Sequence, residues 1–315
     1  NWAVRGHPTA SGKPMLATDP HQPHSIPNTF FYIHLSTPDW DTFGVTFPGI
    51  PYFMMGFTRD VSWGLTTGFI DTFDVFVENE PAPLKKEYVI DVAGQAPSSF
   101  DISLSNRGPI LESLTDELGL STPEKRQYTT SLNWVMRDIP TSAGTLALMP
   151  LAKNSAEFGE SLFENDVCPL VNNIICVDQD DNLRRFIAAT IQKRPGNKRP
   201  NQAPQGVTGS VPLAAWHHEY NFELSKAEEL TVEYNPDCGY SLTANNDTMG
   251  DRGSYPIHNF PTFDSRAERI RELLNEKISE KPQATFTATD FEVMQQDIID
   301  LRSKETVPDL PLIHI

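Results

Sequence analysis

Short apolar segments separated by turn residues dominate the first half of the chain. Six of them are rich in aromatic and β-branched residues and occupy residues 30–35, 52–57, 74–78, 88–92, 100–104 and 131–136. This pattern predicts β-strands. Residues 93–97, rich in small and turn-forming side chains, predict a hairpin link between two of them. The opening apolar run at residues 2–4 is also typical of a strand.

Helical spacing of apolar residues is confined to the second half. Asn154 and Glu157 have the spacing of a capping box, which predicts a helix containing Phe158 and Leu162. Asp264 or Ser265 is expected to begin a second helix. Its apolar face would comprise Ile270, Leu273, Leu274 and Ile278.

A last helix is predicted after Pro282. Thr289 and Glu292 have the spacing of its cap. Its apolar face would comprise Phe291, Met294, Ile298 and Leu301. Strands followed by helices favour an α+β fold over an alternating parallel sheet. Residues 193–209, rich in Pro, Gly, Asn and basic residues, predict an exposed loop within one domain rather than a linker.

The overall charge narrows the range of partners. The chain has 25 Lys and Arg against 42 Asp and Glu, a net charge of −17. Such a surface repels nucleic acid and anionic membranes, so neither is expected as a partner. No apolar segment approaches the ~20 residues of a membrane-spanning helix. Cys168, Cys176 and Cys238 are too few and too widely spaced for a disulfide framework or a zinc signature, and are expected to be buried thiols.

Two local motifs suggest other chemistry. Residues 6–13 superficially resemble a phosphate-binding loop, but the glycines are one residue too far apart and Pro14 stands where a hydroxyl should bind magnesium. His21 and His24 have a spacing that could serve a metal on a helix, yet three neighbouring prolines exclude a helix there. A metal-dependent hydrolase therefore remains a minor alternative.

A series of motifs recurs in a fixed order. Residues 47–51 read Phe-Pro-Gly-Ile-Pro, residues 56–64 read Gly-Phe-Thr-Arg-Asp-Val-Ser-Trp-Gly, and Asp71-x-x-Asp74 follows. Arg-Gly-Pro-Ile-Leu at 107–111, Asn-Pro-x-x-Gly-Tyr at 235–240 and Ala-Asn-Asn at 244–246 come later. Together with the opening Asn1-Trp2-Ala3-Val4, these blocks resemble, in order, the β chain of penicillin acylases. That family consists of N-terminal-nucleophile hydrolases released by self-cleavage.

The resemblance implies a fold, a reaction and partners. The fold would be α+β, a four-layer αββα sandwich, with residues 1–315 as part of one β-chain core and with an α chain from the same precursor as partner. The reaction would be hydrolysis of a small-molecule linear amide to a carboxylic acid and an amine. Family members cleave themselves before a Ser in the pattern Ser-Asn-x-Trp, so that Ser is expected two positions before Asn1. A periplasmic or extracellular location is implied by the same resemblance.

Catalytic roles follow from the chemistry of such a Ser. Its hydroxyl attacks the amide, and its α-amine, with an ordinary pKa of about 7.7–8.0, can act as the base. The tetrahedral oxyanion needs preorganised donors. The resemblance assigns these to the backbone N–H of Thr67 and the side chain of Asn245, and it assigns positioning roles to His21 and Arg266. Taken singly, each of these residues would be an ordinary turn, strand or helix residue, although a cation in the first turn of a helix opposes its dipole.

Binding roles are also implied by the resemblance. Gln22 and Met55 would line the acyl pocket. Asp71, Asp74 and the carbonyl of Phe73 would hold a structural calcium ion, with Asp251 as a further candidate ligand. Without the resemblance, Asp71 and Asp74 would belong to a polar turn after a strand.

One alternative belongs to a different functional class. An amide side chain cannot replace the nucleophilic hydroxyl, so a mature protein that truly starts at Asn1 is expected to lack acylase activity. It would then be an inactive homologue or fragment that keeps the fold as a binding or structural module.

Overall fold

The computed structural model describes most of the chain. The described residues are 1–50, 52–79, 84–112, 129–137, 143–194, 209, 211–220, 222–249, 264–280 and 285–306. Most of the predicted loop at 193–209, together with Asp251 and Pro282, lies outside them. Within the described part, no helix is long and apolar enough to cross a membrane.

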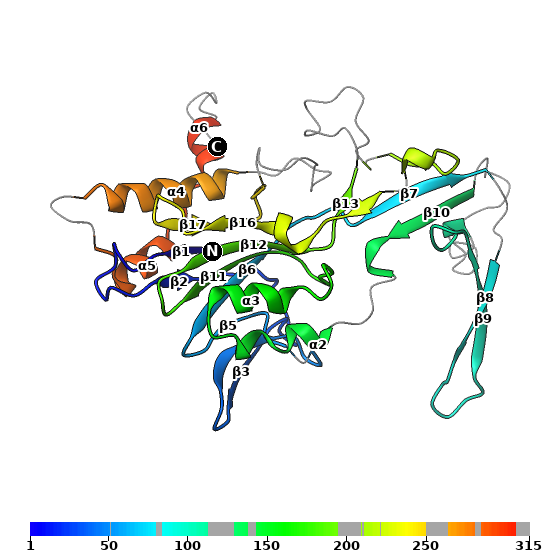
Figure 1. Ribbon diagram of the computed structural model, residues 1–315, viewed down its shortest axis with the longest axis horizontal. Helices are drawn as coiled ribbons and strands as arrows, with labels where there is room; N and C mark the ends of the chain where they lie inside the picture. Colours follow the sequence, from blue (N-terminus) through cyan, green and yellow to red (C-terminus); the bar gives the residue numbers. More distant parts are fainter. Residues whose placement is uncertain are drawn as a thin grey trace, which may run out of the picture.

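A seven-stranded antiparallel sheet forms the centre of the molecule (Figure 1). From one edge to the other its strands are β16 (Thr231–Tyr234), β12 (Leu183–Ala189), β11 (Val171–Asp178), β6 (Val61–Thr67), β5 (Met55–Phe57), β4 (Asp41–Thr46) and β3 (Phe31–Ser36). The central strands β11 and β12 are almost entirely buried, and each carries a run of four apolar residues, at 174–177 and 186–189.

A second, three-stranded antiparallel sheet packs on this one. Its order is β17 (Tyr240–Leu242), β1 (Trp2–Val4) and β2 (Met15–Ala17). Gly64 on β6 permits the close approach of β2, because a Cβ there would lie 2.8 Å from the Thr18 side chain. In the Trp-Gly pair of the sequence motif, Trp63 places a buried indole on one face of β6, and Gly64 leaves room for the β2 segment on the other face.

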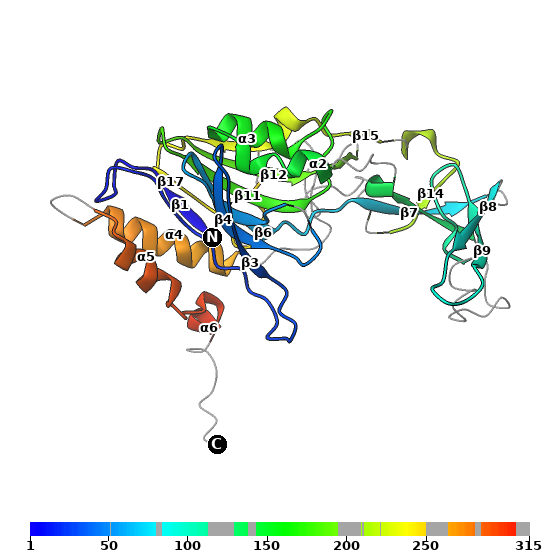
Figure 2. The same ribbon diagram turned by 90° about the horizontal axis from the view of Figure 1, so that it is seen from below.

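Successive side chains of each strand point to opposite faces of its sheet, so the buried apolar residues form three interfaces. Ala3, Ile175 and Val177 pack between the two sheets. Trp2 and Val4 point the other way, toward α4 (Ser265–Ile278) and α5 (Ala288–Gln295). On the far face of the large sheet, Trp63 and its neighbours pack against α3 (Ser155–Leu162) and lie near α2 (Ala143–Leu146). Figure 2 shows the resulting order of helices, small sheet, large sheet and helices.

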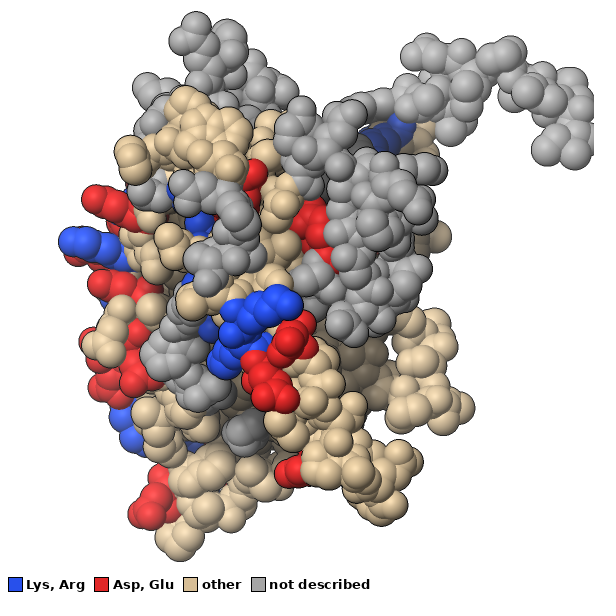
Figure 3. Space-filling model, turned by 90° about the vertical axis from the view of Figure 1, so that its right-hand side faces the viewer, with Lys and Arg blue, Asp and Glu red and all other residues tan. Residues whose placement is uncertain are grey.

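An arm extends from the large sheet beyond β6. It contains β7 (Phe73–Glu78) between β10 (Thr129–Trp134) and β14 (Leu213–Ala214), and the hairpin of β8 (Leu84–Ile90) and β9 (Ser98–Leu104) (Figure 1). Two short strands, β13 (Gln192–Lys193) and β15 (Glu223–Leu224), pair separately. In a view onto the end of the arm, acidic and basic side chains lie next to one another (Figure 3).

Most predicted strands are confirmed, with shifted ends. The segment predicted at 52–57 forms a strand only from Met55, and the one predicted at 131–136 ends at Trp134, where the 3₁₀ turn Val135–Arg137 begins. Asn154 caps α3 through the backbone N–H groups of Ala156 and Glu157, as predicted.

The last predicted helix is confirmed, with Phe291 and Met294 on its packed face, but its predicted cap and length were wrong. Thr287, not Thr289, is the N-cap, in a capping box with Asp290, and the single predicted helix is two: α5 and α6 (Leu301–Thr306). The chain leaves the helix after Gln296, where Asp297 turns aside to pair with Arg269. Ile298, expected on the apolar face, is therefore almost fully exposed.

The cysteines follow the prediction only in part. Cys168 and Cys176 are buried free thiols, and burial raises the pKa of Cys168 to about 12. Cys238 is exposed, contrary to the prediction, because it lies in the turn before β17 rather than in a strand.

Candidate functional site

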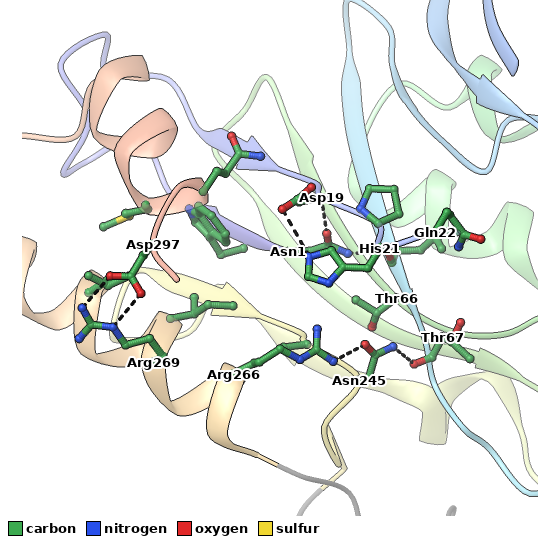
Figure 4. A pocket seen from close by; sticks show the side chains of 18 of the residues that line it. Asn1, Asp19, His21, Gln22, Thr66, Thr67, Asn245, Arg266, Arg269 and Asp297 are labelled. Carbon is green, nitrogen blue, oxygen red and sulfur yellow. Dashed lines mark hydrogen bonds and ion pairs between the residues drawn. The ribbon is translucent and has the colours of Figure 1, made fainter. Parts of the chain in front are cut away.

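A cavity of about 210 Å³ opens where β1 begins. Its walls come from the start of β1, the segment after β2, the end of β6, the turn after β17 and the first turns of α4 (Figure 4). Five of the residues singled out in the sequence line it: His21, Gln22, Thr67, Asn245 and Arg266. The fold therefore brings together positions separated by up to 245 residues along the chain.

The end of β6 presents backbone groups to this cavity. Gly68 N–H bonds to the Val171 carbonyl of β11, so in the antiparallel pattern Thr67 and Leu65 direct their backbone groups to the opposite edge of β6. Strand β5 covers that edge only as far as Trp63. The N–H of Thr67 therefore points from an edge that no described strand covers, on the cavity side.

Asn245 is held beside Thr67 in a defined orientation. Its Nδ2 donates to the Thr67 carbonyl at 2.9 Å, and its Oδ1 accepts from Arg266 Nη2 at 2.6 Å (Figure 4). An amide nitrogen carries two hydrogens, so one remains after the bond to Thr67. Asn245 has a φ of 63°, a left-handed conformation that Asn tolerates better than most residues. Arg266 thus fixes which end of the amide faces Thr67.

The placement of Arg266 accounts for an unfavourable sequence feature. The residue is exposed in the first turn of α4, where a cation opposes the helix dipole. Its bond to the Asn245 oxygen offsets that cost and gives the guanidinium a specific partner. The contact places Arg266 against the Asn245 amide, and its catalytic positioning role stays a prediction.

Asn1 also lines the cavity, although no local pattern marks it as a candidate site residue. Its side chain is buried, with Nδ2 donating to the Leu65 carbonyl at 2.5 Å and Oδ1 accepting from Asp19 N–H at 2.8 Å. Its backbone nitrogen donates to the Thr243 carbonyl at 3.0 Å. Asn1 therefore ties β1 to β6, to the segment after β2 and to the end of β17.

The interior of the site favours a neutral amine. Burial lowers the pKa of an amine placed at the Asn1 nitrogen to about 5; the Asp19 carboxylate opposes this shift and the Arg266 guanidinium reinforces it. An amine in this environment is unprotonated at neutral pH and can accept a proton.

His21 lies at the rim rather than inside. Its side chain is 70% exposed, and Nε2 is 3.6 Å from the Asp19 carboxylate (Figure 4). The described residues hold no cluster of three or more metal-ligating side chains, so His21 and His24 do not meet further ligands among them. Asp19 connects the two parts of the rim, because its backbone bonds Asn1 and its side chain approaches His21.

The two residues predicted to line the acyl pocket lie in different places. Gln22 lines the cavity, whereas Met55 does not. Met55 is buried in the core of the large sheet, with its sulfur 3.1 Å from the Thr18 hydroxyl. Trp2 both packs on Phe291 and forms part of the cavity wall.

The predicted metal residues lie together, but they enclose a guanidinium. Arg194 Nη2 is 2.6 Å from Asp71 Oδ2, and Arg194 Nε is 3.1 Å from Asp74 Oδ1. The Phe73 carbonyl also accepts from Arg194, at 3.4 Å. All three candidate oxygen donors thus face the same organic cation, an arrangement that does not fit a calcium ion in their midst.

A second charged pair borders the cavity and was not anticipated. Arg269 on α4 binds Asp297 through two hydrogen bonds, at 2.8 and 3.1 Å (Figure 4). This pair fastens the segment after α5 to α4, and both residues line the wall. The local spacing predicted separate helices, and nothing along the chain indicates a contact across 28 residues.

Fold and site together define an α+β protein of two packed antiparallel sheets, with an amide side chain and a strand edge converging at the start of β1. Over residues 1–314 the sequence matches the family model described as penicillin amidase. The chain belongs to the penicillin amidase family.

Relatives and a solved structure extend this assignment. The chain is 23% identical to acyl-homoserine lactone acylase QuiP of Pseudomonas aeruginosa, over 90% of this chain and 34% of the relative. It is 26% identical to penicillin acylase 2 proenzyme of a Pseudomonas species, over 87% and 35%. It thus spans about a third of these relatives. A thermostable penicillin G acylase from Alcaligenes faecalis shares the fold, with a TM-score of 0.72 at 17% identity, over 99% of this chain and 56% of that one.

Proposed function

We propose that this chain is the catalytic β-chain core of an acylase that hydrolyses linear amides, with a serine two positions before Asn1 as the nucleophile. One observation carries the proposal: the register of β1. Trp2 lies opposite Leu242, and Asn1 exchanges both backbone hydrogen bonds with Thr243. If the strand continues for two residues in this register, the second one lies opposite Asn245, inside the cavity.

The surrounding groups suit each step of the reaction. The serine hydroxyl attacks the amide carbonyl carbon, and its α-amine takes the hydroxyl proton. The Thr67 N–H and the remaining Asn245 N–H then donate to the oxyanion. Collapse of this intermediate breaks the C–N bond; the amine product leaves with the proton, and an acyl ester remains. Water attacks the ester in the same way and releases the carboxylic acid.

The cavity suits an amine as the base. An α-amine two residues upstream would lie in the cavity that the Arg266 guanidinium lines, and a nearby cation disfavours an ammonium ion. It would therefore be neutral near pH 7 and able to accept the serine proton. In this proposal Arg266 has two roles: it orients Asn245 and it keeps the base unprotonated.

The substrate proposal follows from the relatives. Their names specify acyl-homoserine lactones and penicillins, both of which contain a linear amide. We propose small amides of this kind as substrates, an α chain from the same precursor as partner, and a periplasmic or extracellular location. Gln22 is proposed to contact the acyl group, since it lines the cavity beside His21.

The N-terminus of the mature protein tests the proposal directly. N-terminal sequencing and intact mass should find Ser-x before Asn1, and the same preparation should hydrolyse a chromogenic phenylacetyl amide or an N-acyl homoserine lactone. A mature chain that starts at Asn1 and turns over neither substrate would favour an inactive binding module instead.

A further inference from the structure

A buried ion cluster lies between the large sheet and the arm. Arg194 follows β13, and Asp71 and Asp74 lie on either side of the start of β7. The side chains of Arg194, Asp71 and Asp74 are 1%, 4% and 0% exposed. Charges removed from water to this degree must be compensated within the protein.

The guanidinium contacts the acidic pair as a bridging cation would. It approaches Asp71 through Nη2 and both oxygens of Asp74 through Nε, at 3.1 and 3.3 Å. The same Nη2 reaches the Phe73 carbonyl between them. An arginine is charged at every physiological pH and presents five donors in a fixed plane, so it can replace a multivalent ion that several oxygens share.

The backbone closes over this pair. Gly209 adopts a φ of 70°, and a Cβ at this position would lie 2.5 Å from Asp74 Oδ1 and 2.8 Å from Arg194 Nε. Only glycine combines this conformation with the space that the ion pair requires.

A second arginine lies nearby. The Arg107 guanidinium stacks on the ring of Phe76, 4.0 Å from its centroid. Phe76 and Asp74 both belong to β7, so Arg107 places a second cation along the strand that carries Asp74.

From this geometry we propose that Arg194 is the resident cation of the Asp71–Asp74 site, and that this protein holds the site together without a divalent metal. The cluster links the segment after β6 to the residue that follows β13. Asp71, which belongs to this segment, lies four residues beyond Thr67. A metal-independent link at this point fixes the strand end that carries the proposed oxyanion donor.

The test uses the complete protein, as the cell makes it, with Tm as readout. Dialysis against a chelator and re-addition of CaCl₂ should leave the Tm of the wild type unchanged. Arg194→Met should lower Tm on the order of 5–10 °C, because it leaves two buried carboxylates without their partner. Arg194→Lys, which keeps the charge, should lose less.

Arg184→Met is the matched control. Arg184 lies at the start of β12, where it stacks on Tyr234 and donates to the Ser155 hydroxyl, and it contacts neither acid. Three results would overturn the proposal: a wild-type Tm that falls in chelator and recovers with calcium, calcium raising Tm equally in wild type and Arg194→Met, or Arg194→Met as stable as the control. If Arg194→Met fails to fold, the chelator experiment on wild type and Arg194→Lys decides.

Discussion

Arg266 and Arg194 both donate to polar acceptors, but their surroundings differ. Arg266 is exposed on α4 and bonds the neutral Asn245 amide at the cavity. Arg194 is buried and lies between two carboxylates. Water screens the first contact and leaves it little net stability, whereas the second cannot be broken without stranding charge in the interior. Arg266 therefore orients a neighbouring side chain, whereas Arg194 stabilises the folded state.

This contrast predicts that variants of the Asn245–Arg266 contact change turnover while Tm stays nearly constant. The largest effect is expected for Asn245→Gly, which removes the amide and still permits the left-handed backbone. Loss of one oxyanion donor should lower kcat about 10²–10³-fold. Steady-state kinetics and a melting curve check this result, with Gln95→Ala on the arm as control. A Tm that falls in parallel with kcat would remove the distinction between the two arginines.

A smaller loss is expected at Asn1. Asn1→Ala removes the bonds to Leu65 and Asp19, each worth about 1 kcal/mol, and should lower kcat about 10-fold with little change in KM. Asn1→Asp should be worse, because its second oxygen would face the Leu65 carbonyl. Equal kcat for all three proteins would contradict a positioning role.

Arg266 offers a conservative comparison. Arg266→Met should lower kcat about 10-fold by releasing the Asn245 amide, and Arg266→Lys should recover part of this loss. The pH profile adds an independent readout, because loss of the cation should raise the pKa of the nearby amine and shift the acidic limb of the profile upward. An unchanged limb would show that Arg266 acts through the amide alone.

The Arg269–Asp297 pair is less buried than the Arg194 cluster and more buried than Arg266. The smallest effect of a substitution is expected at this pair. The Arg269 hydrogen bonds lower the pKa of the Asp297 carboxyl, and burial partly opposes them. A depressed acid pKa stabilises the fold fully above the ordinary Asp value of about 3.9, and this contribution is lost as the pH falls through the folded value. Asp297→Asn should therefore cost about 1 kcal/mol at pH 7 and almost nothing in strong acid. Chemical denaturation across this pH range checks it.

Local sequence patterns were reliable where a short stretch determines its own structure. The β8–β9 hairpin and the Asn154 cap of α3 lie where the pattern predicts, since neighbouring residues supply the partners. The length of the last helix was mispredicted because a distant partner, Arg269, draws Asp297 out of the helical path. Met55 does not line this cavity, and its assignment to an acyl pocket, which came from the family resemblance, stays a prediction.

The sequence by itself established the α+β class, the absence of a disulfide framework and, through the order of its motifs, the family. It also marked His21, Thr67, Asn245 and Arg266 as one group. Only the tertiary structure decided how they meet: the β6 register aims Thr67 at the cavity, Arg266 orients Asn245, and Asn1 joins three strands. It also placed Arg194 between Asp71 and Asp74. These outcomes depend on contacts between residues from 18 to 242 positions apart, and hydrogen-bond direction and burial across such separations leave no trace in local periodicity.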